Sequence, residues 1–319
     1  MHVSSALVAL AAHLAVIVRV LTYRKNGARH RFHVAWAAWV IVAISGGSAI
    51  ELLFHPTPTG FFHAALQRLV RAGYPVDVSH LYDEQTERAV QTLQAAAGLV
   101  VDGIAGPKTY RVLASGQRDP KHLTDADLAR AAATLGVSLA CVRAVNEVES
   151  RGVGFLDDGR PKILFERHVM YQRLVANVGR EAADAAAARW PDVVNPKRGG
   201  YQGGAAEYVR LDTAARIDAA SAYESASWGA FQIMAYHWKR LGYASVDEFV
   251  SRMELGEAEH LDAFVRYVAA DKKLLAALRA RKWAAFSEGY NGPGFAINLH
   301  DVKLDRAYAK YAGTGKAAA

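Results

Sequence analysis

The chain of 319 residues contains a single cysteine, Cys141. One thiol can form neither an intramolecular disulfide nor a multi-cysteine metal site, which excludes a disulfide-stapled secreted scaffold and a zinc ribbon. Charged residues make up only 22% of the chain and hydrophobic residues 52%, and this balance excludes wholesale disorder. The chain is longer than a typical domain of roughly 100–200 residues, so two or three units are expected.

Several common catalytic motifs are also missing. Residues 116–312 hold no glycine-rich phosphate loop, no His-x-x-x-His pair and no Gly-x-Ser-x-Gly nucleophile elbow. These absences disfavour metal-dependent and serine hydrolase chemistry. No metal and no cofactor is therefore expected.

The positive charge of the chain is concentrated near its N-terminus. The net charge is +7, with a pI near 9.4. Residues 1–55 hold five Lys or Arg against one acid, Glu51, and so supply +4 of this total. The remaining chain is nearly neutral and has no basic-aromatic stripe, so nucleic acid is not an expected partner.

Two apolar runs flank a basic loop in this N-terminal region. Residues 3–23 and 34–54 are each long enough, at about 31 Å as helices, to cross a bilayer. The loop 24–31 carries four fixed positive charges, which the positive-inside rule places in the cytoplasm. The alternatives are two buried helices of a soluble domain or a cleaved signal peptide. A signal peptide fits poorly, since the first run exceeds the usual 7–15 residue core and lacks a basic start.

Residues 19–31 read Arg-x-x-Thr-Tyr-Arg-Lys-Asn-Gly-Ala-Arg-His-Arg. This loop resembles that of small multi-span phage holins, which implies a membrane hairpin over residues 1–55. Such holins have a third span, whereas here a proline-rich linker, His-Pro-Thr-Pro-Thr-Gly, follows at residues 55–60. Small residues at 45–49 would let a second helix approach closely, so self-association of the transmembrane helices is a further expectation.

The next segment has the pattern of three short helices. Leu66 and Leu69 begin a first helix, a turn follows at residues 73–75, Val90 and Leu93 belong to a second helix, and Pro107 opens a third. Leu-Gln pairs at 66–67 and 93–94, with Asp-Gly-x-x-Gly-Pro-x-Thr at 102–109, resemble a small three-helix peptidoglycan-binding domain. The resemblance implies these wall-binding residues: Leu93, Gln94, Asp102, Gly103 and Gly106. The alternative is that they only build a small helical core.

Residues 139–152 have the pattern of a helix that stops at Gly152. Its apolar residues repeat every three positions, and Glu149 adjoins that buried face at the C-terminal end. Backbone carbonyls concentrate partial negative charge there and disfavour an anionic side chain, which suits a general acid. The alternative is an ordinary solvated helix acid.

Three motifs follow one another along the last part of the chain: Glu-Ser at 149–150, Glu-Ser-Ala-Ser-Trp-Gly-Ala-Phe-Gln-Ile-Met at 224–234, and Gly-Tyr-Asn-Gly-Pro-Gly at 289–294. With Arg-Pro-Lys-Ile-Leu-Phe-Glu-Arg-His at 160–168, they resemble the N-acetylmuramidase domain of phage endolysins, a lysozyme-like fold. The resemblance covers residues 125–312. It implies a mostly helical domain with a small β element, in which Glu149 protonates the glycosidic oxygen between N-acetylmuramic acid and N-acetylglucosamine. It also implies these substrate-binding residues: Ser150, Ser227, Gln232, Tyr290 and Asn291.

A second carboxylate would be needed for hydrolysis by two acids. Glu224 is the candidate by its place in the matched motif, ahead of Glu166. Either residue can instead make a structural contact, and Tyr290 can serve only to brace Glu149. A muramidase and a lytic transglycosylase therefore both stay open, as does a holin-like membrane protein with a degenerate C-terminus. The intact motif set argues against this last alternative.

The sequence thus predicts a mainly α chain of three parts: a transmembrane hairpin at 1–55, a peptidoglycan-binding domain at 56–115 and a catalytic domain at 116–319. Because the basic loop lies inside, the soluble parts are expected on the periplasmic side of the inner membrane. The expected partners are peptidoglycan and that membrane.

Overall fold

The computed structural model describes residues 70, 73–74, 82–150 and 152–314. They all belong to one compact unit, Phe62–Ala319. The predicted hairpin at 1–55, the linker after it and the first helix around Leu66 lie outside the described residues. Within the described part, no single helix has the length and apolar character needed to cross a bilayer, and only two successive helices bent by 113° meet that requirement jointly.

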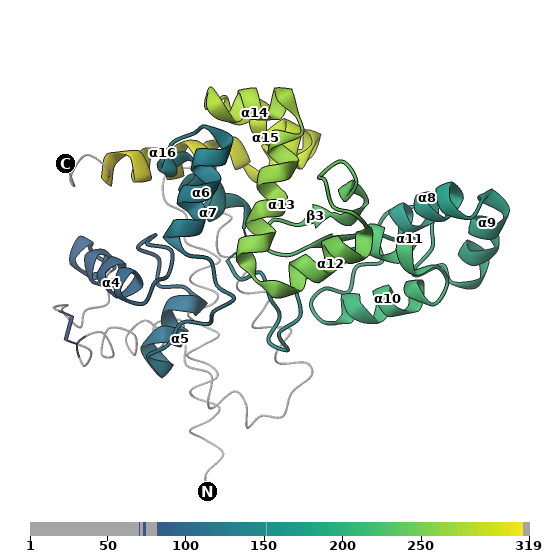
Figure 1. The fold of residues 1–319 in the computed structure, drawn as a ribbon, viewed down its shortest axis with the longest axis horizontal. Helices are drawn as coiled ribbons and strands as arrows, with labels where there is room; N and C mark the ends of the chain where they lie inside the picture. The colour runs from purple at the N-terminus through teal and green to yellow at the C-terminus, as the bar shows by residue number, and fades with distance from the viewer. Residues whose placement is uncertain (1–69, 71–72, 75–81, 151, 315–319) are drawn as a thin grey trace, which may run out of the picture. The chain divides into compact units, whose positions relative to one another are not determined.

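Two helices of the predicted wall-binding module are described (Figure 1). Helix α4 (Glu84–Ala96) begins at Asp83, whose carboxylate accepts a hydrogen bond from the backbone of Thr86. Helix α5 (Pro107–Ser115) has proline in its first turn, as the sequence predicts. Their core is small and consists of Ala89, Val90, Leu93, Leu99 and Val112.

The predicted catalytic domain begins with α6 (Asp125–Leu135) and α7 (Leu139–Glu149). A reciprocal capping box between Thr124 and Asp127 starts α6, and the Ser138 hydroxyl caps α7. Val142 and Val145 are buried, so the predicted apolar face of α7 is the one that packs into the core. Glu149 is the last residue of this helix.

Three short strands form the β element. They are β1 (Ile163–Phe165), β2 (Ala226–Trp228) and β3 (Ile233–Met234), in an antiparallel sheet of that order. Ser227 of β2 pairs with Leu164 on one side and Met234 on the other. The β2–β3 turn passes so close to the His260 ring that a Cβ on Gly229 would lie 2.5 Å from it. Glycine is therefore required there.

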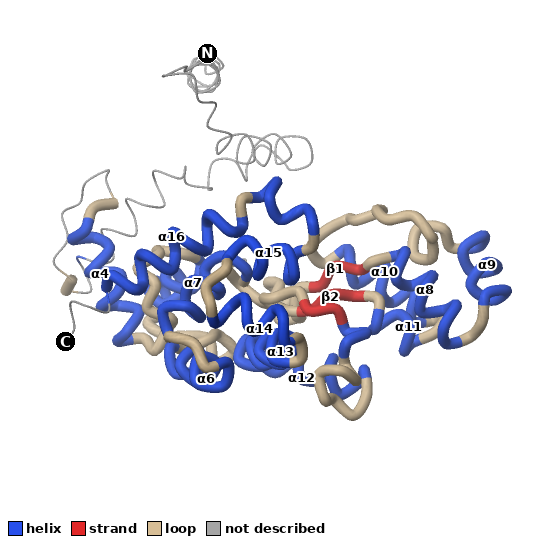
Figure 2. Tube along the Cα trace, turned by 90° about the horizontal axis from the view of Figure 1, so that it is seen from above, coloured by secondary structure: helices blue, strands red, loops and turns tan. Residues whose placement is uncertain are grey.

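The remaining helices lie on either side of the strands (Figure 2). One group comprises α8 (Arg167–Asn177), α9 (Arg180–Arg189), α10 (Ala206–Ala215) and α11 (Ala219–Glu224). The other comprises η3 (Ala235–His237), α12 (Val246–Leu255), α13 (Glu257–Ala269), α14 (Lys272–Arg279), α15 (Trp283–Asn291), η4 (Pro293–Asn298) and α16 (His300–Thr314). Helix α16 packs against α7 and α15. The described part is thus mainly helical with a small strand element, and one continuous core runs through the catalytic domain.

Candidate active site

A pocket of about 230 Å³ opens beside the C-terminal end of α7. Segments far apart in the sequence supply its walls: α7, the β2–β3 turn, η3, α13 and α15. The residues around it are Glu149, Phe231, Gln232, Ile233, Met234, Tyr236, His237, Tyr267, Tyr290 and Asn291. The structure therefore brings four of the predicted site residues together: Glu149, Gln232, Tyr290 and Asn291.

Glu149 is only 7% exposed, and its carboxyl contacts an amide and an imidazole. The Asn291 amide, at the end of α15, donates to Glu149 Oε1 at 3.2 Å and to Oε2 at 3.4 Å. His300 Nδ1, at the start of α16, lies 3.1 Å from Oε1. The carboxyl is thus held in place through two neighbours, and Oε2 is the less engaged oxygen.

Sequence reasoning missed His300. It lies outside all three motifs, and it reaches Glu149 only because α16 packs against α7. A single sequence carries no signal for that contact.

Tyr290 braces the site. Its hydroxyl donates to the backbone carbonyl of Phe231 at 2.7 Å, and its ring packs edge-on against Phe264 and Tyr267. The ring stacks on Phe286 as well. Tyr290 therefore connects α15 to the β2–β3 turn. Because Asn291 follows Tyr290 in the chain, this contact also fixes the turn relative to Asn291.

Gln232 and Ser227 shape the turn from within. Gln232 has a left-handed backbone (φ 52°), which is costly for a residue other than glycine. Its side-chain amide donates to Gly229 O at 2.8 Å and to Lys162 O at 3.3 Å, while its oxygen accepts from the Ser227 hydroxyl at 2.9 Å. These bonds offset the backbone strain. Both side chains are engaged within the protein, and the turn presents the segment 231–234 to the pocket.

An aromatic wall faces the pocket from the other side. The rings of Tyr236 and Tyr267 lie 4.2 Å and 5.1 Å from the ring of His237. Burial, assisted by the nearby Arg240 guanidinium, lowers the pKa of His237 to about 4. The imidazole is therefore neutral at neutral pH and serves as a flat polar surface. Sequence reasoning missed these residues, although Tyr236 and His237 lie within three residues of the end of the matched motif.

The structure does not bring Glu224 together with Glu149. Glu224 is 6% exposed and does not line the pocket. Arg173 Nε donates to its Oε2 at 2.6 Å, and Trp238 Nε1 donates to its Oε1 at 2.8 Å. Oε2 is thus engaged in an ion pair that joins α8 to α11, and Oε1 in a hydrogen bond to the indole.

Glu166, the other candidate for a second carboxylate, also has partners elsewhere. Its Oε2 accepts from the Tyr201 hydroxyl at 2.8 Å and lies 3.1 Å from His168 Nδ1. Among the described residues around the pocket, Glu149 is the one carboxylate. No group of three or more His, Cys, Asp or Glu in the described part is arranged to hold a metal ion.

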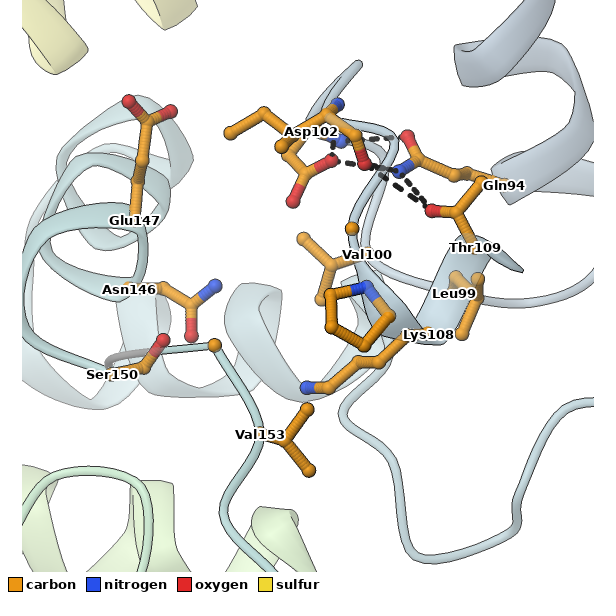
Figure 3. Close-up of a pocket in the computed structure, with 14 residues that line it drawn as sticks. Gln94, Leu99, Val100, Asp102, Lys108, Thr109, Asn146, Glu147, Ser150 and Val153 are labelled. Carbon is orange, nitrogen blue, oxygen red and sulfur yellow. Dashed lines mark hydrogen bonds between the residues drawn. The ribbon is translucent and has the colours of Figure 1, made fainter. Parts of the chain in front are cut away.

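Ser150 follows Glu149 but faces a different space. It is 6% exposed and lines a second pocket, shared with three predicted wall-binding residues, Gln94, Asp102 and Gly106 (Figure 3). The structure therefore separates Ser150 from the other predicted substrate-binding residues.

Inside the wall-binding module, Gln94 organises the signature turn. Its oxygen accepts from the backbone N–H groups of Asp102 and Gly103, and its nitrogen donates to Asp102 Oδ1 at 2.7 Å and to Thr109 Oγ1 at 3.1 Å. Gly103 has φ +71°, and a Cβ there would lie 2.8 Å from the Glu87 side chain. Leu93 is in the module core. The signature residues therefore shape this turn.

Comparison with known proteins gives three family matches. Residues 138–312 match the N-acetylmuramidase family, residues 63–113 a peptidoglycan binding domain, and residues 8–72 a 3TM holin family of phages. The crystal structure of an endolysin from Burkholderia phage AP3 is 57% identical, with a TM-score of 0.75, over 79% of this chain and 95% of that one. The search of curated proteins returns no match.

Proposed function

The chain belongs to the N-acetylmuramidase family and is a glycoside hydrolase with peptidoglycan as its substrate, and from that premise we propose that Glu149 is the general acid. A sugar alkoxide is a poor leaving group, so cleavage of the glycosidic bond needs a proton donor at the leaving oxygen. The observation that carries the proposal is the position of Glu149, which is a buried carboxyl lining a pocket that holds no other described carboxylate.

Asn291 and His300 position the acid. Both contact Glu149 Oε1, whereas Oε2 has only the longer Asn291 contact. Oε2 is therefore the oxygen placed to give its proton to the substrate. Once the proton has left, the Asn291 amide stabilises the carboxylate, and His300 adds a second donor in the tautomer that carries its proton on Nδ1.

Because Glu149 is the one described carboxylate around the pocket, the nucleophile must come from elsewhere. With no second acid in the described pocket to attack the sugar, the substrate's own acetamido oxygen attacks C1 as the C1–O bond breaks, as in substrate-assisted glycosidases. The Glu149 proton goes to the leaving oxygen. Water then attacks C1, the bond between C1 and the acetamido oxygen breaks and restores the acetamido group, and the Glu149 carboxylate takes up the proton of that water.

The competing outcome is internal attack by the C6 hydroxyl of muramic acid, which would make the enzyme a lytic transglycosylase. Mass analysis of digested peptidoglycan separates the two, because hydrolysis leaves a reducing muramic acid end and internal attack leaves a 1,6-anhydro end. We expect reducing ends. A digest consisting of 1,6-anhydro products would overturn water attack, and digestion by the Glu149→Gln chain would overturn the role of Glu149.

The N-terminal segment supports a location for this activity. The holin match over residues 8–72 and the four charges of loop 24–31 support a hairpin in the bacterial inner membrane with its loop in the cytoplasm. Residues 56–319 would then be tethered on the periplasmic side, next to the wall, at a raised effective concentration of substrate. A reporter active only outside the cytoplasm, joined after residue 319, should be active, and an inactive one would contradict this topology. Crosslinking of the full chain in membranes tests self-association of the spans.

A further inference from the structure

The second pocket lies at the junction of the wall-binding module and the catalytic domain (Figure 3). Its volume is about 270 Å³. One wall is the end of α7 with the loop after it, and the other is the signature turn of the wall-binding module, residues 99–109, with Gln94 behind it. Neither module encloses the space alone.

Fixed contacts hold the two walls together. The Lys108 ammonium, on α5, lies 2.5 Å from Glu257 Oε2, at the start of α13, and the Glu257 side chain is wholly buried. The Glu257 carboxylate also accepts backbone N–H bonds from Leu123 and Gly154. On the other side, Lys310 of α16 donates to the carbonyl of Asp102 at 2.9 Å. The pocket is therefore part of a docked interface.

The lining combines aliphatic surface with a few polar groups. Val100 and Val153 supply apolar surface on opposite sides. The Asn146 side chain points into the pocket (Figure 3) and makes no hydrogen bond to any residue that the structure describes. Amide and carboxyl groups that converge on a mostly apolar pocket are typical of sites that fix a small polar ligand.

The charges of the described residues around the pocket favour a neutral ligand. Asp102 and Glu147 both line it, while the two lysines nearby are already paired, Lys108 with Glu257 and Lys310 with Glu147. Burial is the largest influence on Asp102 and raises the pKa of its carboxyl. A peptide stem, which carries several carboxylates, would be repelled here, whereas the hydroxyl and acetamido groups of a neutral sugar have partners.

We propose that this junction pocket binds an N-acetylglucosamine unit of the glycan strand, with the Asn146 amide hydrogen-bonded to the sugar. Ser150 lines this pocket and Glu149, the residue before it, lines the active-site pocket, so the end of α7 contributes to both pockets. The wall-binding module then acts as part of the substrate cleft as well as an anchor. The choice of ligand rests on the proposed function.

The test uses the full chain in detergent micelles, in a Glu149→Gln background that prevents turnover. The probe is the N-acetylglucosamine trimer, measured by calorimetry. We expect two sites for the parent chain, of which Asn146→Trp removes one by filling the pocket and Asn146→Leu weakens one about tenfold by removing the amide. Val209→Trp, at a residue that is 65% exposed and lines neither pocket, is the matched control and should keep both sites.

Three outcomes would overturn the proposal. The first is a single trimer site in the parent chain, and the second is two unchanged trimer sites in Asn146→Leu. The third is that the pocket binds a free stem tetrapeptide instead of the trimer, with Asn146→Leu weakening the binding of that peptide. If Asn146→Trp fails to fold, Asn146→Leu still tests the proposal. A failure of the proposed function is distinguishable, because the chain with native Glu149 would then leave peptidoglycan intact whatever the trimer result.

Discussion

Two buried carboxyl groups in this protein occupy equivalent positions in their helices but have different surroundings. Glu149 ends α7 and Glu224 ends α11, and they are 7% and 6% exposed. Glu149 meets an amide and an imidazole beside a pocket, whereas Glu224 meets the Arg173 guanidinium and an indole N–H inside the fold. Burial at a helix end therefore does not distinguish an acid that reacts from one that holds the fold, but the partners do.

The first prediction removes the acid from the Glu149 region. Glu149→Gln should reduce peptidoglycan clearing by about a thousandfold, since general acid catalysis contributes roughly 10²–10⁴. The amide is nearly isosteric, so the melting temperature should stay close to that of the parent chain. Turbidity clearing and thermal unfolding measure the two effects. Clearing at the parent rate would remove the distinction between the two carboxyls.

The second prediction applies the same substitution to Glu224. Glu224→Gln leaves Arg173 without its charge partner and should lower the free energy of unfolding by roughly 2–3 kcal/mol, discounted because Arg173 is 30% exposed. Activity at a temperature where the variant is folded should stay within a fewfold of the parent. Denaturant unfolding and clearing at 20 °C test this. A folded Glu224→Gln chain as inactive as Glu149→Gln would make Glu224 a second catalytic group.

Local secondary structure could be predicted well from the sequence. Whether a given polar side chain is catalytic or makes a structural contact could be predicted less well. The helix containing Glu149, its apolar face and the proline start of α5 all follow from patterns within one or two helical turns, and the structure confirms them. Glu224 was the candidate second carboxylate by its place in the matched motif, but its partner Arg173 lies 51 residues away in the chain. That ion pair exists only after α8 and α11 have packed together, so no local pattern indicates it.

Within the motifs, the sequence could not separate side chains that face the substrate from side chains that hold the turn. Ser227, Gln232, Asn291 and Gln94 are all polar signature residues. Only tertiary hydrogen bonds show that Gln232 and Ser227 bond each other, that Gln94 is enclosed by its own turn, and that Asn291 reaches Glu149.

The third prediction concerns His300, the imidazole partner that distinguishes Glu149 from Glu224. His300→Leu removes the group 3.1 Å from Glu149 Oε1 and should lower kcat about tenfold with KM nearly unchanged, because the acid loses orientation while the sugar contacts remain. His300→Asn places an amide near the position of Nδ1 and should restore most of kcat. Steady-state kinetics on soluble glycan fragments separate the two constants. Equal losses in both variants, or a change confined to KM, would assign His300 a merely structural role.

The smallest expected effect comes from a third buried carboxylate, Glu257, which belongs with Glu224 as a structural group. Burial alone would raise its pKa, but the Lys108 charge and the hydrogen bonds from Lys108, Leu123 and Gly154 outweigh it and hold the pKa below the usual 4.5. Its folded-state pKa is thus lower than its unfolded one, so its contribution to stability is present above about pH 4.5 and is lost as the pH falls through the folded value.

Lys108→Met removes the opposing charge and leaves burial as the dominant influence on the pKa of Glu257. We expect a loss of about 1 kcal/mol at pH 7, moderated by the two remaining backbone bonds, and a smaller loss at pH 4, where the unpaired carboxyl takes up a proton. Melting temperatures at both pH values, with the exposed Lys273→Met as control, measure this difference. A loss that grew toward pH 4 would show that Lys108 does not stabilise the charged form of Glu257 and would separate Glu257 from the structural carboxylates.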